Sequence, residues 1–148
     1  MNRFDWLTLF VAFEGAPSGL DPVRLQKGMF LFAQEAETVP PGEKYVFRPY
    51  SYGPMSREIY TDLDRLAEQG LVEQVPVEGQ TWSRYKPTNR GVERAHRLMR
   101  EALARHDRDT KHFYRIKQVV AQTSFADLLE GVYDRYPEYA ANSIFKRR

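Results

Sequence analysis

Histidines are the first candidates for acid–base or metal chemistry, and this sequence has three of them. His96, His106 and His112 are separated by ten and six residues. None has a second histidine at the i+3 or i+4 spacing that places two imidazoles on one face of a helix as metal ligands. Asp107 and Asp109 could complete a site only if the chain turned sharply beside them. The spacing therefore favours structural histidines, and we predict no metal site.

Motifs for nucleophilic or phosphate chemistry are missing from the sequence. The chain of 148 residues contains no cysteine, which excludes thiolate nucleophiles, disulfides and thiolate zinc sites. Its nine glycines form no nucleophile elbow, Walker loop or dinucleotide-binding fingerprint. Pairs of carboxylates for acid–base work meet through the fold, so the sequence leaves them open. We therefore expect a protein that is not an enzyme and that needs no cofactor.

Arginines could bind phosphates, and they recur along one predicted helix. Five of them follow near-helical spacing opposite the apolar stripe of this helix: Arg90, Arg94, Arg97, Arg105 and Arg108. Residues 89–112 carry seven Lys and Arg against four acids, although the net charge of the whole chain is only +2. Such a row of arginines can bind successive phosphates of double-stranded DNA or an acidic surface of a protein. The alternative is a solvated helix face, and the tail Lys146-Arg147-Arg148 is a second basic cluster.

Six helices that would position these residues are predicted from N-caps, helix breakers and apolar periodicity. Asp21 followed by Pro22 is the clearest start, because it joins an N-cap residue to proline at the first helical position. Gly53 followed by Pro54 is interpreted in the same way, as the start of the third helix. Thr88 caps the long helix that carries the arginines. The predicted helices cover residues 4–14, 22–36, 54–69, 89–106, 111–121 and 125–136.

Two extended segments complete the pattern. Residues 71–87 change to strand periodicity around a Glu78-Gly79 turn, which predicts a hairpin. Residues 45–50 predict a short edge strand or an extended crossing segment. The order helix, helix, short strand, helix, hairpin, helix is typical of a winged-helix module. We therefore expect an α+β, mostly α, single domain over residues 1–148. Its winged-helix-like core would span 20–88 with the wing at 71–87, and a helical extension over 89–148 would pack beside it or form a homodimer.

Large aromatic side chains near the wing are the candidate contacts for a protein partner. Trp82 is the best single candidate, because a large aromatic on a short exposed hairpin is hard to bury. Tyr50 and Tyr52 belong to an aromatic string before the Gly53-Pro54 corner, and tyrosine anchors interfaces at low entropic cost. The alternative is that this string covers the core between helices.

The predicted recognition helix has the wrong charge for reading DNA. In a winged helix it would enter the major groove and face the phosphates. Arg57 could still contact DNA, but Arg57 and Arg65 are outnumbered by four acids on the same helix: Glu58, Asp62, Asp64 and Glu68. Carboxylates are repelled by the negative potential of the phosphates. DNA binding, if it occurs, is therefore expected from the arginine line.

Several short segments resemble known families. They are Leu25-Gln26-Lys27, Phe30-Leu31-Phe32-Ala33-Gln34, Tyr50-Ser51-Tyr52-Gly53-Pro54, Leu66 to Gly70 with Leu71-Val72, Leu128 to Tyr139, and Asn142-Ser143. Together they cover about residues 20–145 and resemble the YwgA-like proteins. The earlier segments are similar, more distantly, to the Panacea (SocA-like) antitoxin domain. The first resemblance implies a fold more than a function. Panacea domains neutralise toxins by direct contact, so the second implies a protein partner, and no functional residue is carried over.

The amino-acid composition argues against a disordered protein and against a membrane-spanning one. A hydrophobic content of 42% and an aromatic content of 14% supply core material that disordered chains lack. No run approaches the roughly 18 apolar residues of a membrane span, so we expect a cytoplasmic protein with no membrane partner. Our first hypothesis is a non-enzymatic regulatory or interaction module, of antitoxin or adaptor type, that binds a protein partner. The alternative is a winged-helix transcriptional regulator that binds double-stranded DNA.

Overall fold

The computed structural model describes residues 1–14, 16 and 18–145, and most of this part of the chain is helical. The expected α+β, mostly α class is therefore confirmed. None of the described helices is both long and apolar enough to cross a membrane. The elements follow in chain order: α1 (Arg3–Ala12), α2 (Pro22–Glu35), the 3-10 helix η1 (Pro41–Glu43), β1 (Arg48–Tyr50), β2 (Gly53–Met55), α3 (Arg57–Glu68), β3 (Val72–Pro76), β4 (Ser83–Pro87), α4 (Asn89–Arg105), α5 (Asp107–Gln122), α6 (Phe125–Arg135) and η2 (Pro137–Ala140).

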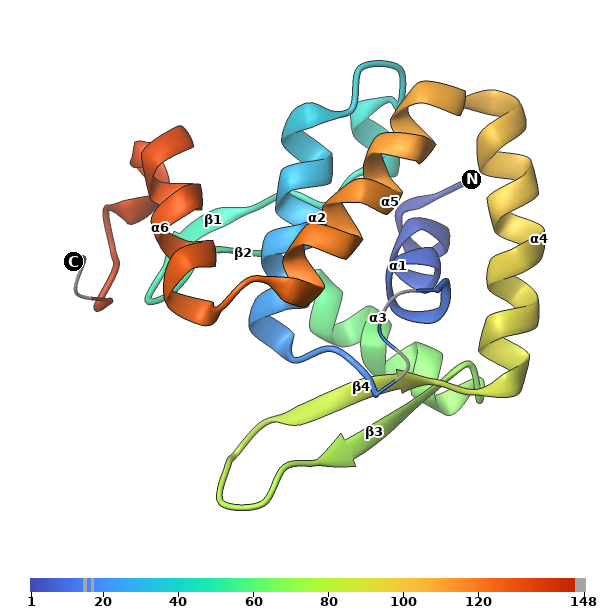
Figure 1. Ribbon diagram of the computed structural model, residues 1–148, viewed down its shortest axis with the longest axis horizontal. Coiled ribbons are helices and arrows are strands. Elements are labelled where there is room, and N and C mark those ends of the chain that lie inside the picture. The colour runs from blue at the N-terminus through green and yellow to red at the C-terminus, as the bar shows by residue number, and fades with distance from the viewer. Residues whose placement is uncertain (15, 17, 146–148) are drawn as a thin grey trace.

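Helix α1 lies inside the molecule, with α4 on one side and α2 and α5 on the other (Figure 1). Every residue from Trp6 to Ala12 is buried, as expected for a helix that is apolar on most sides. The ring of Trp6 lies 4.7 Å from that of Phe32 and 5.2 Å from that of Phe113, measured between centroids. This aromatic cluster joins α1, α2 and α5 into one core.

Side-chain N-caps begin three of the described helices, and those predicted at Asp21 and Thr88 are confirmed. The Asp21 carboxylate accepts a hydrogen bond of 2.9 Å from the backbone N–H of Arg24 at the start of α2. The hydroxyls of Thr88 and Ser124 accept equivalent bonds at the starts of α4 and α6. Gly70 follows α3 with a φ of +72°, the left-handed conformation that ends a helix without a steric cost to glycine. Local capping chemistry thus fixes these ends.

The helix start predicted at Gly53-Pro54 is wrong. These residues belong to β2, which pairs with β1 in antiparallel register so that Pro54 lies opposite Pro49. Gly53 has a φ of +84° and closes the tight turn between the two strands. Helix α3 begins only after Ser56, at Arg57. The strand expected over residues 45–50 is likewise shorter and is limited to β1.

Helix α5 begins at Asp107 rather than at Lys111, directly after α4 ends. The early start is held by Asp109, whose carboxylate accepts backbone hydrogen bonds of 2.9 Å from Glu37 and 2.7 Å from Thr38. The first turn of α5 is thereby tied to the segment that follows α2. The arginines predicted for one long helix consequently lie on two.

The hairpin of β3 and β4 forms as expected, with Pro76 opposite Ser83 at its outer end. Its β4 edge pairs with Leu20, in the segment between α1 and α2. The N–H of Leu20 donates to the carbonyl of Tyr85 at 3.0 Å, and the N–H of Tyr85 donates to the carbonyl of Leu20 at 2.9 Å. The hairpin is therefore attached at its base, and its outer end extends along the lower edge of the molecule in Figure 1.

Candidate functional site

A cleft of about 890 Å³ opens between the β3–β4 hairpin, α3 and the first turns of α2 and α6. We call it the hairpin cleft. Five aromatic side chains from four separate parts of the chain line it: Tyr52, Tyr60, Trp82, Tyr85 and Phe125. Trp82 is 39% exposed and Tyr52 is 43% exposed, so both rings are accessible from solvent. An accessible cleft with this many aromatic walls has the composition of a binding site.

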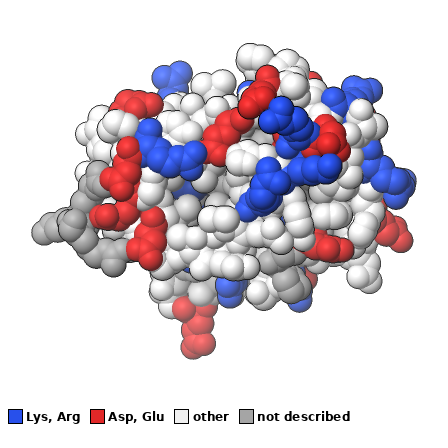
Figure 2. Space-filling model, turned by 45° about the horizontal axis from the view of Figure 1, so that its top comes forward, with Lys and Arg blue, Asp and Glu red and all other residues white. Residues whose placement is uncertain are grey.

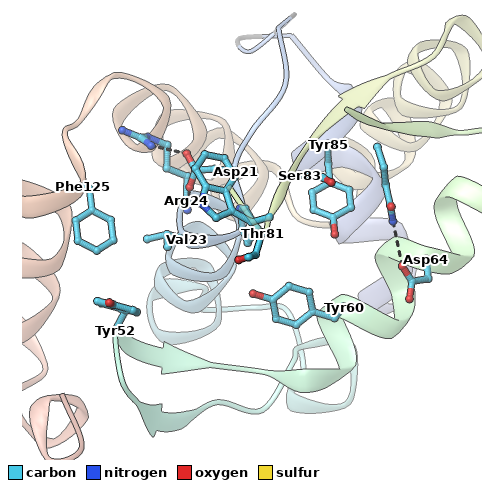
Figure 3. A pocket seen from close by; sticks show the side chains of 13 residues that line it. Asp21, Val23, Arg24, Tyr52, Tyr60, Asp64, Thr81, Ser83, Tyr85 and Phe125 are labelled. Carbon is cyan, nitrogen blue, oxygen red and sulfur yellow. Dashed lines mark hydrogen bonds and ion pairs between the residues drawn. The ribbon is translucent and has the colours of Figure 1, made fainter. Parts of the chain in front are cut away.

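One end of the hairpin cleft is apolar. Figure 3 shows Val23, Tyr52 and Phe125 together at this end. The rings of Tyr52 and Phe125 meet edge to face, with centroids 5.6 Å apart. Phe125 also packs against Phe145, at 5.7 Å between centroids. These contacts support the rings from behind and leave an apolar surface facing the cleft.

The other end of the hairpin cleft is polar and is formed by Tyr60, Asp64 and Tyr85 (Figure 3). Asp64 accepts a hydrogen bond of 3.0 Å from the side-chain amide of Gln74. The hydroxyls of Tyr60 and Tyr85 have no hydrogen-bond partner among the described residues. Burial raises the pKa of Tyr60, and the charge of Asp21 raises it further. Burial likewise raises the pKa of Tyr85, with a further contribution from Asp64, so both hydroxyls keep their protons.

An ion pair forms the wall of the cleft between these two ends. The Asp21 carboxylate, which caps α2, also binds the guanidinium of Arg24. Arg24 donates a further hydrogen bond of 2.8 Å to the carbonyl of Thr123, just before α6. The pair thus links the start of α2 to the start of α6, and its two charges compensate each other.

Helix α3 presents Tyr60 and Asp64 to the cleft because its other face is anchored in the core. Tyr60 and Asp64 are four residues apart and therefore lie on one side of the helix. Gln26, which is 2% exposed, fixes the start of α3 with two hydrogen bonds of 2.9 Å to the backbone of Ser56. The adjacent Lys27 donates to the carbonyl of Pro54 at 3.1 Å, and burial lowers its pKa to about 8.

The structure brings together two of the three predicted partner-contact residues. Trp82 and Tyr52 both line the hairpin cleft. Tyr50 does not, because its hydroxyl accepts a hydrogen bond from Arg57 and its ring lies beneath that guanidinium, 5.7 Å away. The pair occupies the corner where β1 approaches the start of α3. Arg57 is therefore separate from the other arginines predicted to contact DNA.

Sequence reasoning missed three of the lining aromatics, Tyr60, Tyr85 and Phe125, as parts of this site. The sequence placed Tyr85 on a strand and Phe125 on a helix, and it suggested Tyr60 only as a possible DNA contact. Their convergence depends on how the hairpin folds against α2 and α3. Gln26 was also missed, although it carried a signal. Met29 and Phe30 lie three and four positions further on and therefore share a helix face with Gln26. Because these two residues are apolar, the sequence indicates that the Gln26 amide points toward the core.

The predicted line of arginines is interrupted. Arg90, Arg94 and Arg97 lie on α4, but Arg108 lies on α5, so the expectation of a single helical line is wrong. Arg105, at the end of α4, is held by Glu101 at 3.7 Å. Figure 2 shows basic and acidic side chains interspersed on the face that includes the top of Figure 1. The cluster Lys146-Arg147-Arg148 lies outside the described residues.

The histidines are engaged in packing and pairing. His112 lies 2.6 Å from Glu35, a contact that joins α5 to the end of α2, and His106 lies 2.8 Å from the hydroxyl of Thr38. His96 packs edge to face on Phe13, with centroids 5.5 Å apart. No group of three potential metal ligands occurs in the part of the chain that the structure describes.

The comparisons with known proteins add no relative. A scan of the sequence against protein-family models finds no match, and a search of curated proteins finds none either. The resemblances drawn from short segments stay predictions. We therefore infer function from the hairpin cleft and from the charged surfaces around it.

Proposed function

We propose that this protein is a non-enzymatic regulatory or adaptor module that binds a segment of a partner protein in the hairpin cleft. One observation carries the proposal. Tyr52 and Trp82, two accessible aromatics from different hairpins, line one cleft together with Tyr60, Tyr85 and Phe125. Tyrosine and tryptophan give large contact areas for little loss of side-chain entropy, which is why they dominate the energetics of protein interfaces.

The charged groups of the cleft support binding over catalysis. Asp21 is paired with Arg24, and Asp64 is hydrogen-bonded to the amide of Gln74. A carboxylate that activates a nucleophile would form a hydrogen bond to a hydroxyl, a thiol or a water. Neither Asp21 nor Asp64 makes such a contact among the described residues. The cleft is suited to holding an extended segment whose apolar side chain lies on Tyr52.

We also propose that the chain folds as a winged-helix-like core followed by a helical extension. Helices α1, α2 and α3 followed by the β3–β4 hairpin have the order of such a core, and the bridge at Leu20 takes the place of its first strand. The β1–β2 hairpin is then an insertion before α3. Helix α3, in the recognition position, carries more acids than arginines, and its Tyr60 and Asp64 line the cleft. This charge favours a protein partner over a phosphate backbone.

The proposal is tested by affinity capture with variants of the cleft. The full chain is immobilised and exposed to nuclease-treated host lysate beside the double variant Tyr52→Ala/Trp82→Ala. Val119→Ala is the matched control, because it removes an exposed apolar side chain from α5, away from the cleft. We expect a stoichiometric partner that wild type and Val119→Ala retain and that the double variant loses. A partner retained equally by all three, or no partner at all, contradicts the proposal.

DNA binding through α4 is a second candidate, favoured by the charge of that helix. Helix α4 carries five arginines and two glutamates, and Arg90 and Arg97 are exposed. Under this alternative, Arg94→Glu/Arg97→Glu abolishes binding to a generic duplex, and wild-type binding weakens steeply as salt rises. Fluorescence anisotropy at low and near-physiological salt measures both effects. Absence of binding at low salt excludes this candidate.

A further inference from the structure

The hairpin cleft has one charged side chain whose charge is not balanced. Three charged residues line the cleft, and Asp21 and Arg24 are paired with each other. Asp64 accepts a hydrogen bond from the neutral amide of Gln74 and has no cation within ion-pair distance among the described residues. Its side chain is exposed, and its negative charge gives this end of the cleft a negative potential.

The rings of Tyr60 and Tyr85 lie on the cleft side of this carboxylate, and the Tyr60 hydroxyl points away from it, toward Val23 (Figure 3). Tyr60 and Tyr85 come from α3 and β4, and their hydroxyls point into the space between the helix and the hairpin (Figure 3). Ring faces attract cations through their quadrupole, and a phenolic oxygen can accept a hydrogen bond from an N–H donor. The raised pKa of Tyr85, caused by burial and then by Asp64, agrees with a site that disfavours further negative charge.

We propose that the Asp64 end of the hairpin cleft binds a cationic side chain of the partner segment, with arginine preferred over lysine. This inference rests on the proposed function and names the chemistry that the partner must bring. Arginine is preferred because its planar guanidinium can stack on Tyr60 while its N–H groups reach the oxygens of Asp64 and Tyr85. An ammonium group can make the ion pair but cannot stack in this way.

The two ends of the cleft together define the segment that fits. The apolar end at Tyr52 and Phe125 takes an apolar or aromatic side chain, and the Asp64 end takes the guanidinium. An acidic segment is excluded from the Asp64 end by like-charge repulsion. The occupant is therefore an extended stretch of a partner protein in which an arginine is close to an apolar residue.

The experiment uses peptides selected on the full chain. A phage library of random peptides is selected on the wild-type protein and counter-selected on Tyr52→Ala/Trp82→Ala, so that the retained peptides require the cleft. The binding of synthetic copies is then measured on wild type, on Asp64→Asn and on Glu73→Gln. Glu73→Gln is the matched control, because Glu73 is exposed on β3 next to Gln74 and alternation points it to the opposite face of the hairpin.

We expect the selected peptides to contain arginine beside an apolar residue. Asp64→Asn keeps the acceptor for Gln74 and removes only the charge, so the affinity should fall about fivefold, the upper range for an exposed ion pair. Glu73→Gln should leave the affinity unchanged. Citrulline in place of the peptide arginine should lower the affinity of wild type at least as much, and that of Asp64→Asn less, because the ion pair is already absent from the variant.

Two results separate this inference from the function on which it rests. Peptides that require Tyr52 and Trp82 but contain no basic residue, or that bind Asp64→Asn as tightly as wild type, overturn the cationic subsite and leave the peptide-binding function standing. A selection that yields no peptide dependent on these two aromatics contradicts the function itself.

Discussion

Replacing Gln26 by leucine should destabilise the protein by about 2–4 kcal/mol. The Gln26 side chain accepts from the N–H of Ser56 and donates to its carbonyl, both at 2.9 Å, and both residues are buried. Leucine fills similar space but leaves the Ser56 N–H without a partner, which costs about 1–3 kcal/mol. The carbonyl of Ser56 keeps a hydrogen bond of 3.3 Å from Ile59, so the second loss is about 1 kcal/mol.

Urea unfolding of wild type, Gln26→Leu and Gln34→Leu measures this effect. Gln34 lies on the same helix but is exposed, so its replacement should change the free energy of unfolding by less than about 0.5 kcal/mol. Ser56 directly precedes α3, which carries Tyr60 and Asp64 into the hairpin cleft. The variant should therefore also lower the affinity of the cleft for a ligand. A Gln26→Leu protein within about 1 kcal/mol of wild type would refute the argument that this amide holds the start of α3.

Three further predictions concern other buried contacts. Gly91→Ala should destabilise the protein by more than about 3 kcal/mol in urea unfolding, because a Cβ there would lie 1.9 Å from the carbonyl oxygen of Leu71. Burial lowers the pKa of Lys117 to about 7, so the unfolded chain binds more protons above that pH and the free energy of unfolding should rise from pH 7 to pH 10. Lys117→Met should flatten this rise by up to about 1.4 kcal/mol per pH unit, and an unchanged slope would contradict the assignment. Burial of Asp109 opposes its ionisation, but hydrogen bonds from residues 37–39 together lower its pKa. Asp109→Asn should therefore destabilise the protein by about 1–3 kcal/mol at pH 7, and by less as the pH falls through that lowered pKa.

Sequence reasoning located those elements whose ends depend on local chemistry. Asp21 and Thr88 are good N-caps, and each places its helix correctly because the cap acts on residues two or three positions away. Gly53-Pro54 failed because the same residue types suit a helix start and a tight turn between strands. The deciding contacts come from Gln26 and Lys27, which hold Ser56 and Pro54 from a distant part of the chain.

The candidate site shows the same division between local and distant information. Trp82 could be singled out because a large aromatic on a short exposed hairpin is hard to bury, and Tyr52 because it belongs to an aromatic string before the Gly53-Pro54 corner. The sequence could not show that both side chains line one cleft, because this depends on how α2, α3 and the hairpin are placed relative to one another. Helical spacing likewise predicted one arginine line, but the break before Asp107 moved Arg108 to another helix.

The charge of α3 links the fold to the proposed function. In the recognition position of a winged helix, this helix would need cationic side chains to approach DNA. Its solvent-facing side instead presents Tyr60 and Asp64 to the hairpin cleft, while Ile59 and Leu63 are buried in the core. In the proposed winged-helix-like arrangement, α3 would therefore display a surface for a cationic and apolar segment of a partner protein.

The two tryptophans allow the most direct test of binding in the cleft. Trp82 lines the hairpin cleft and Trp6 is 0% exposed in the core, so a ¹⁵N spectrum gives one indole N–H signal at the site and one inside the protein. Titration with a selected arginine-containing peptide should shift the Trp82 signal in proportion to occupancy and leave the Trp6 signal unchanged. A peptide that binds the protein while the Trp82 signal stays in place would contradict the claim that the hairpin cleft is the binding site.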